Sequence, residues 1–285
     1  MMFGRRSFIL AAAACALIPA GTSARTVRLR IDEDRIFMPV IVNGQPTEAI
    51  LDSAAEMTVI GLDFANRLGL DGGKKVIARG TGAATTGARL VTGVTLGAAG
   101  LTLRPETVAV IDLGDISRRL QHGRPINVIL GRDLFDAARL AIDIEGGTLD
   151  IVPRAATPPG RRVPLTMRRG IETLPVLVEG HAAAADFDLG NGGRTLIGAA
   201  FAARHGLLGD GRATGRIGGG GIGGETQQTT LGLRRLDLAG RRFEAIDAVI
   251  DTNPDASDAN VGVALLRRFY IVTDFAHRAV WLKPR

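Results

Sequence analysis

The sequence predicts an all-β fold with a few short helices, built as two barrel-like lobes related by a pseudo-twofold axis. Three observations lead to this prediction. The chain repeats its own landmarks in order, its apolar residues form short alternating or β-branched runs, and turn signals separate those runs. The length suits either one large domain or two lobes, and the repeat favours two lobes.

Two landmarks set the offset between the halves. Pro39 and Pro175 each open a Pro-Val-x-Val-x-Gly segment and lie 136 positions apart, as do Asp52 and Asp188. Three further matches keep this order: Arg67-Leu68-Gly69-Leu70 with Arg204-His205-Gly206-Leu207, Val128–Gly131 with Asn260–Gly262, and Asp143 and Pro153 with Asp274 and Pro284. The predicted domains are an N-terminal lobe over 25–153, a proline- and arginine-rich linker over 154–171 and a C-terminal lobe over 172–285.

The strands are predicted from runs such as 40–42, 57–60, 108–111, 194–197 and 248–250. Turns between strands are predicted at Asn43-Gly44, Glu145-Gly146-Gly147 and Ala239-Gly240. Helical spacing of apolar residues is confined to four short pieces, at 62–68, 132–138, 199–205 and 264–269.

Residues 1–24 predict a cleaved export signal. Arg5 and Arg6 precede an apolar run from Phe8 to Ala20, which is shorter than the roughly 20 residues of a spanning helix. The paired arginines are typical of a twin-arginine signal, with an ordinary secretory signal as the alternative. Cys15, the single cysteine, lies within this segment and is a weak candidate for lipid attachment. We therefore expect an exported bacterial protein, periplasmic or secreted, with no stable membrane anchor and no disulfide.

Composition argues against several other classes of function. The net charge of +6 falls to +4 without Arg5 and Arg6, and one Trp and one Tyr provide little for base stacking, so nucleic-acid binding is not expected. The four histidines lack metal-ligand spacing, and the chain has no Gly-x-Ser-x-Gly elbow. A Gly-x-Gly-x-x-Gly at Gly218 is not followed by a helix opening with a basic residue. We expect neither a cofactor nor a metal.

Asp52 and Asp188 are the candidate catalytic residues. Each ends an apolar strand and enters a tight turn of small residues that leads to another strand. If the two turns meet, the carboxylates share one proton, because like charges at contact distance cannot both ionise cheaply. One carboxylate can then activate a water while the other hydrogen-bonds to the carbonyl under attack. Either aspartate taken alone is more simply a turn-capping carboxylate, as we expect for Asp143 and Asp274.

At these residues the sequence resembles the retropepsin-like aspartic proteases, in particular the exported bacterial form with two tandem units in one chain. The resemblance rests on the Pro-Val-x-Val-x-Gly strand, the aspartate turn, the Leu-Gly-Leu helix end, a glycine-rich hairpin and the Ile-Leu-Gly segment. It implies two acid-protease lobes, peptide-bond hydrolysis at Asp52 and Asp188, a protein or peptide substrate, and a monomer with an internal pseudo-dimer.

The two turns depart from the family pattern of Asp-Thr/Ser-Gly-Ala. The first, supported by Ser53 and Ala54, lacks the glycine, and the second, with Gly190 and Asn191, has Leu189 in place of the hydroxyl residue. In the family this hydroxyl bonds the opposite turn, which Ser53 can do and Leu189 cannot. A methyl group at Ala54 would be strained if the backbone there required positive φ. The alternative is therefore a protease-derived protein that binds extended segments without cleavage.

The resemblance also assigns two hairpins the task of covering substrate. They are 79–87, with Gly80 and Gly82, and 216–228, with Gly219 and Gly220. Glycines suit a lid that bends and lies close to a peptide backbone. The alternative for each is a mobile surface loop.

Overall fold

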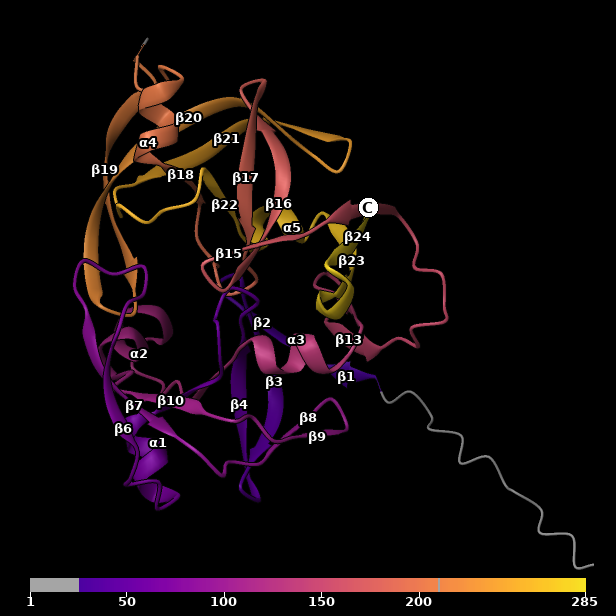
Figure 1. The fold of residues 1–285 in the computed structure, drawn as a ribbon. Coiled ribbons are helices and arrows are strands. Elements are labelled where there is room, and N and C mark those ends of the chain that lie inside the picture. Colours follow the sequence, from indigo (N-terminus) through magenta and orange to yellow (C-terminus); the bar gives the residue numbers. More distant parts are fainter. Residues whose placement is uncertain (1–25, 210) are drawn as a thin grey trace, which may run out of the picture.

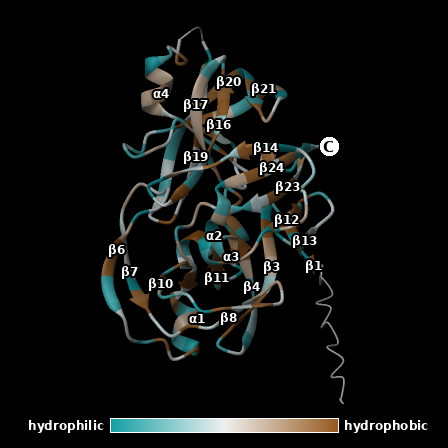
Figure 2. Ribbon diagram, turned by 45° about the vertical axis from the view of Figure 1, so that its right-hand side comes forward, coloured by the Kyte–Doolittle hydropathy of each residue, from teal (hydrophilic) through white to brown (hydrophobic). Residues whose placement is uncertain are grey.

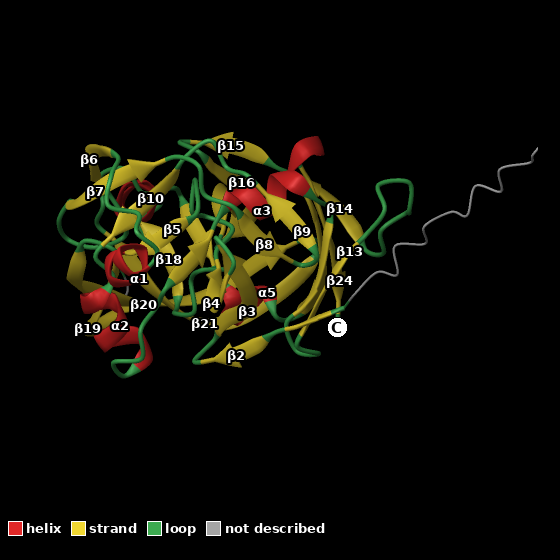
Figure 3. Ribbon diagram, turned by 90° about the horizontal axis from the view of Figure 1, so that it is seen from below, coloured by secondary structure: helices red, strands yellow, loops and turns green. Residues whose placement is uncertain are grey.

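The computed structural model describes residues 26–209 and 211–285. The predicted export signal at 1–24 lies outside the described residues. Strands dominate, and the short helices lie among and around them (Figures 1 and 3). The predicted all-β fold with a few short helices is therefore confirmed. Among the described helices, none is long and apolar enough to cross a membrane.

The N-terminal half is built on one large sheet, in the order β6-β7-β10-β5-β11-β4-β3-β8-β9, with β2 paired to β3. Asn43 and Gly44 form the β3–β4 turn with φ values of 46° and 83°, the left-handed conformation that asparagine and glycine tolerate best. The strands of this sheet are β2 (Arg30–Asp32), β3 (Arg35–Val42), β4 (Gln45–Leu51), β5 (Val59–Gly61), β6 (Lys74–Ala78), β7 (Thr86–Val91), β8 (Leu96–Ala98), β9 (Leu101–Leu103), β10 (Val108–Ile111) and β11 (Val128–Leu130).

The C-terminal half has its own sheet, in the order β15-β16-β17-β22-β18-β21-β20-β19, and β16 also pairs with β20. Because β16 joins β17 on one side and β20 on the other, the sheet curls on itself. Its strands are β15 (Thr166–Arg168), β16 (Ile171–Val178), β17 (His181–Phe187), β18 (Thr195–Gly198), β19 (Ala213–Gly221), β20 (Gly224–Leu238), β21 (Arg241–Asp251) and β22 (Ala259–Val261).

The two large sheets use the same pairing pattern around their central strands. β11 runs parallel to β4 and antiparallel to β5, while β22 runs parallel to β17 and antiparallel to β18. β10 and β21 then lie parallel to β5 and β18. These pairings align Ile50 and Ile129 of the first half with Asp186 and Asn260 of the second.

A third sheet joins the halves, in the order β1-β13-β12-β23-β24-β14. At its centre β12 from the first half pairs with β23 from the second, placing Ala141 opposite Val272. Hydrophobic residues concentrate on the strands, and one core cluster runs from Ile36 to Leu282 through both halves (Figure 2). The strands are β1 (Val27–Arg28), β12 (Leu140–Asp143), β13 (Thr148–Ile151), β14 (Arg161–Pro164), β23 (Phe269–Asp274) and β24 (Ala279–Pro284).

The helices are short and follow strands. Three agree with the predicted pieces, and α5 ends earlier than predicted because Phe269 is buried as the first residue of β23. The helix α2 was not predicted, because Ile116 and Leu120 are the apolar residues that give it an amphipathic pattern and they are too few to show it in the sequence. The helices are α1 (Leu62–Arg67), α2 (Gly114–Gln121), α3 (Arg132–Ala137), α4 (Ala199–Arg204), α5 (Val263–Leu266) and the 3₁₀ turn η1 (Phe275–His277).

The segment expected as a linker, 154–171, contains two strands. β14 pairs with β24 in the joining sheet, and β15 pairs with β16 in the C-terminal sheet. Val163 and Leu165 are buried. Proline and arginine content suggested an exposed connection, but the alternating apolar residues add strands to existing sheet edges. The strands expected at 57–60 and 194–197 begin at Val59 and Thr195.

Candidate active site

The first aspartate turn is held by its own backbone. β4 ends at the buried Leu51, and the Asp52 N–H donates to Leu130 O at 3.0 Å, which continues the parallel pairing with β11. The Asp52 carboxylate Oδ1 accepts the N–H groups of Ala54 and Ala55 at 2.8 and 3.0 Å. Turn amides thereby fix the carboxylate at the strand end.

The second turn repeats these contacts and adds one. The Asp188 N–H donates to Val261 O at 3.1 Å, and Asp188 Oδ1 accepts the N–H groups of Gly190 and Asn191 at 2.9 and 3.0 Å. Asp188 Oδ2 additionally accepts the Asn260 Nδ2 amide at 2.7 Å. The second carboxylate is therefore more fully hydrogen-bonded than the first.

Ser53 links the two turns. Its hydroxyl donates to Phe187 O at 2.7 Å and accepts the Leu189 N–H at 2.9 Å, and the side chain is 3% exposed. Leu189 cannot return a hydrogen bond, and its side chain is fully buried in the core. The link is therefore one-sided, with a single hydroxyl holding both partners.

Gly190 brings the second turn against the first carboxylate. A Cβ at Gly190 would overlap the Asp52 carboxyl group, with Oδ1 2.6 Å away. Ala54 occupies the matching position of the first turn, and it is not among the residues with positive φ. The backbone strain considered for Ala54 is therefore absent, because neither turn uses the left-handed conformation at this position.

The two carboxyl groups influence each other electrostatically. Burial is the largest cause that raises the pKa of Asp52 to about 7, and the Asp188 charge is the second. The hydrogen bonds from two backbone N–H groups favour the ionised form and oppose this rise. Burial also raises the pKa of Asp188, and the Asn260, Asn191 and Gly190 donors oppose that rise. The pair is therefore able to hold one proton in a range where ordinary aspartates hold none.

The sheet faces beside the two aspartates differ in polarity. In the first half, Ile50 and Ile129 face an apolar cluster that also contains Ile111. At the matching positions of the second half lie Asp186, Asn260 and Asp251. Asp186 accepts the Ser257 hydroxyl at 2.6 Å. Burial, with the Asp188 and Asp251 charges, raises the pKa of Asp186 to about 6.

The two glycine-rich hairpins meet at their tips, as the left side of Figure 1 shows. The Gly82 and Ala84 N–H groups donate to Ile222 O and Gly223 O, each at 2.9 Å. A Cβ at Gly80 would lie 2.6 Å from Ile222 O, and one at Gly82 would lie 2.7 Å from the Gly223 Cα. These two glycines therefore permit the close approach of the hairpins.

The second hairpin also reaches the first aspartate's surroundings. Ile222 packs against the apolar cluster that includes Ile50, as does Ala55 of the first aspartate turn, and Arg119 of α2 donates to Gly221 O at 2.9 Å. Gly219 and Gly220 lie near the end of β19, just before this tip, and Gly220 has a φ of 110°. The hairpin tips thus lie over the N-terminal half near the Asp52 turn.

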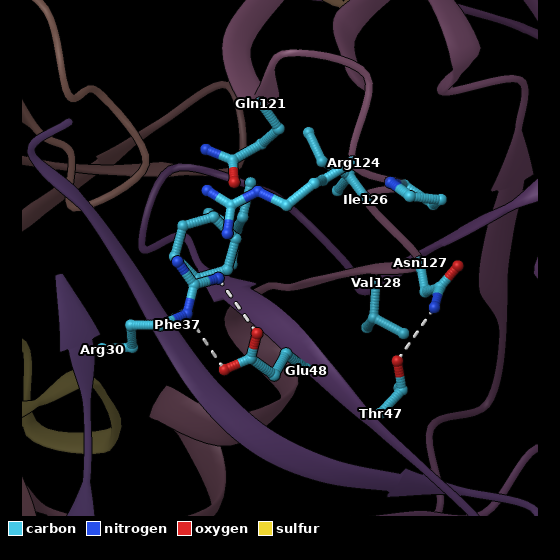
Figure 4. A pocket seen from close by; sticks show the side chains of 11 residues that line it. Arg30, Phe37, Thr47, Glu48, Gln121, Arg124, Ile126, Asn127 and Val128 are labelled. Carbon is cyan, nitrogen blue, oxygen red and sulfur yellow. Dashed lines mark hydrogen bonds and ion pairs between the residues drawn. The ribbon is translucent and has the colours of Figure 1, made fainter. Parts of the chain in front are cut away.

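A cavity of about 260 Å³ is lined in part by Ile50, two positions before Asp52. Phe37 and Ile126 contribute apolar walls, and the Arg30 guanidinium lies over the Phe37 ring and is paired with Glu48 (Figure 4). Elsewhere in its lining, Asn127 donates to Thr47 at 3.0 Å. The lining of the cavity therefore combines apolar side chains with an ion pair.

Three residues near the site were not identified as site residues from the sequence: Asn260, Asp186 and Arg119. Asn260 could have been found, because a polar residue there replaces the apolar Ile129 of the first half within an otherwise apolar strand. Asp186 could have been found in the same way, opposite Ile50. The part of the chain that the structure describes contains no group of three or more His, Cys, Asp or Glu side chains placed to hold a metal ion.

Comparison with known proteins finds a match in the N-terminal half of the chain. A family model described as aspartyl protease matches residues 38–134, from β3 to α3. The matched stretch contains Asp52, Ser53 and the first glycine-rich hairpin, and it ends before the C-terminal half with Asp188. No curated protein matches the chain.

Proposed function

We propose that the protein is an aspartic endopeptidase in which Asp52 and Asp188 activate one water to hydrolyse a peptide bond. The observation that carries this proposal is the convergence of the two turns. Ser53 links them, and the Asp188 charge contributes to raising the pKa of Asp52 to about 7. Paired carboxyl groups that share a proton provide an acid and a base at one place.

The proposed reaction needs only these two groups and water. The ionised carboxylate takes a proton from the water while the water oxygen bonds to the peptide carbonyl carbon. The other carboxyl group gives its proton to the carbonyl oxygen. The C–N bond then breaks as the leaving nitrogen takes the proton held by the first group. A hydroxyl of the tetrahedral intermediate returns a proton to the second group, which restores the starting state.

We propose that the substrate is a protein or peptide in extended form, covered by the two hairpins. The contacts of Gly80 and Gly82 with Ile222 and Gly223 support a lid made by both halves. The cavity beside Ile50 has room for a side chain of such a substrate.

A second candidate is a binding protein that keeps this arrangement without cutting. Leu189 favours it, because Leu189 has no hydroxyl to return the hydrogen bond that Ser53 makes to the opposite turn. Such a protein would hold extended segments through backbone hydrogen bonds.

The test is cleavage of a denatured protein and a peptide library from acidic to neutral pH, comparing the parent with Asp52→Asn and Asp188→Asn. Each substitution removes a proton donor or acceptor, so we expect at least a hundredfold loss of cleavage. Asp112→Asn is the matched control, because Asp112 is an exposed turn aspartate that accepts the Gly114 N–H, and it should cut like the parent. Folded proteins that capture peptides equally and never cut would support the binding protein.

Export, the two-unit organisation and a monomeric state are also proposals. The matching strand pairings of the two large sheets support a duplicated unit. The Arg5-Arg6 pair and the apolar run after it support export.

A further inference from the structure

Asn260 occupies a position that distinguishes the two aspartates. It lies in the middle of β22, between the core residues Ala259 and Val261, and faces the opposite side of the sheet beside Asp186. Its side chain is 7% exposed. In the first half the matching residue is Ile129, which lies beside Ile50 and offers no hydrogen bond.

The orientation of the Asn260 amide follows from its neighbours. Asn191 Oδ1 accepts the Gly193 N–H at 2.8 Å, and Asn191 Nδ2 donates to Arg194 O at 3.2 Å. Because a backbone N–H only donates and a carbonyl only accepts, the Asn191 amide has one allowed orientation. Its Nδ2 also donates to Asn260 Oδ1 at 2.8 Å, so the Asn260 Nδ2 is the group that donates to Asp188.

The two carboxylates therefore receive different sets of donors. Asp188 accepts N–H groups at both oxygens, two backbone amides at Oδ1 and Asn260 at Oδ2. Asp52 accepts two backbone amides at Oδ1. Within the described residues, no hydrogen bond reaches Asp52 Oδ2, which leaves that oxygen available for a proton. Donors to a carboxylate favour its ionised form.

Asp186 on β17 is a carboxyl group that interacts electrostatically with Asp188. The charges of Asp188 and of Asp251 on β21 raise the pKa of Asp186, and Arg169 before β16 opposes that rise. Burial holds the pKa of Asp186 at about 6, so below that pH it is mostly neutral and no longer disfavours a charge on Asp188.

We propose that Asn260 is a positioning residue that makes Asp188 the ionised member of the pair and leaves Asp52 as the proton donor. This inference rests on the proposed peptidase activity for its catalytic meaning. Asp188 is then the group that takes the proton from water, and Asp52 protonates the peptide carbonyl oxygen.

The test compares the parent with Asn260→Leu, which removes the donor at similar volume, and Asn260→Thr, which retains one. We expect the acidic limb of the kcat/KM profile to move up by about one to two pH units in Asn260→Leu, because loss of a bond to a charged acceptor raises the pKa of Asp188. Asn260→Thr should shift it less. A purely structural role would lower kcat/KM at all pH values without moving the limb.

A second measurement tests the order in which the two aspartates ionise and does not depend on peptide cleavage. The aspartate carboxyl carbons of the ¹³C-labelled full chain are titrated by NMR, with Asp52→Asn and Asp188→Asn used to assign signals. We expect Asp188 to ionise before Asp52 in the parent, and at higher pH in Asn260→Leu. If Asp52 ionises first, or the Asp188 titration is unchanged in folded Asn260→Leu, the assignment is wrong, whether or not the protein cuts peptides.

Discussion

At the residue scale, the chemistry of the pair depends on how closely the two turns pack. The glycine at 190 leaves no space between its turn and the Asp52 carboxyl group, and the Ser53 hydroxyl spans the same junction. A shift of about 1 Å in a reacting group can reduce turnover a hundredfold. The activity proposed for this site is therefore sensitive to single atoms added at the junction.

We predict that Gly190→Ala reduces cleavage at least a hundredfold while the chain remains folded, because the new methyl group must displace the Asp52 carboxyl or its own turn. The control is Gly232→Ala in β20, where the new Cβ has no atom within 4 Å. Peptide cleavage and circular dichroism are measured for both. Equal activity of the two variants would contradict the packing seen at Gly190.

At the scale of elements, the hairpins β6–β7 and β19–β20 interact through backbone atoms. The N–H groups of Gly82 and Ala84 bond the tip of the other hairpin, and the approach is so close that Gly80 and Gly82 have no room for a Cβ. Glycine also lowers the cost of bending when the hairpins open.

We predict that Gly82→Ala breaks the contact between the hairpins, because its Cβ would lie 2.7 Å from the Gly223 Cα. In this variant, hydrogen exchange should accelerate at the backbone amides of positions 82 and 84 and should not change at the amides of β12 and β23. Gly87→Ala in β7, whose Cβ has no atom within 4 Å, is the control and should leave exchange unchanged. Unaltered exchange in Gly82→Ala would show that the tips do not bond in solution.

At the scale of the whole molecule, the halves are joined by the pairing of β12 with β23 and by a buried ion pair. Arg139 donates through Nε and Nη2 to Asp274 Oδ2 at 3.0 and 2.8 Å, with Asp274 fully buried and Arg139 8% exposed. Arg139 also donates to Arg154 O and Ala156 O at 3.0 and 2.8 Å. One side chain thus connects both halves with the segment between them, and Asp274 has the structural role expected for it.

We predict that Asp274→Asn lowers the free energy of unfolding by about 3–5 kcal/mol, because it leaves the buried Arg139 charge without its partner. Replacing both partners, with Arg139→Met and Asp274→Leu, should cost less. The control is Glu145→Gln, which removes an exposed ion pair between the halves with Arg267 and should cost less than about 1 kcal/mol. Urea unfolding measures all three, and equal costs for Asp274→Asn and Glu145→Gln would contradict the buried role.

Local signals in the sequence predicted the helices α1, α3, α4 and α5 and the strands β3, β5, β10, β18 and β21, but missed α2 and the strands of 154–171. The helix α2 has a glycine at its first position and few apolar residues, so its spacing is weak, yet the apolar cluster of the first half stabilises it. β14 exists because β24 offers it an open edge. Both elements depend on partners elsewhere in the chain, which override weak local preference.

Strand period, turn chemistry and the repeated order are local or internal to the chain, so they were enough to predict the strand-rich class, the glycine turns and the two candidate aspartates. The hydrogen bonds of Ser53 to the opposite turn and of Asn260 to Asp188 became visible only in three dimensions. The same is true of the ion pair between Arg139 and Asp274. These contacts join residues 72 to 136 positions apart, so strand register and the packing of the two halves determine them.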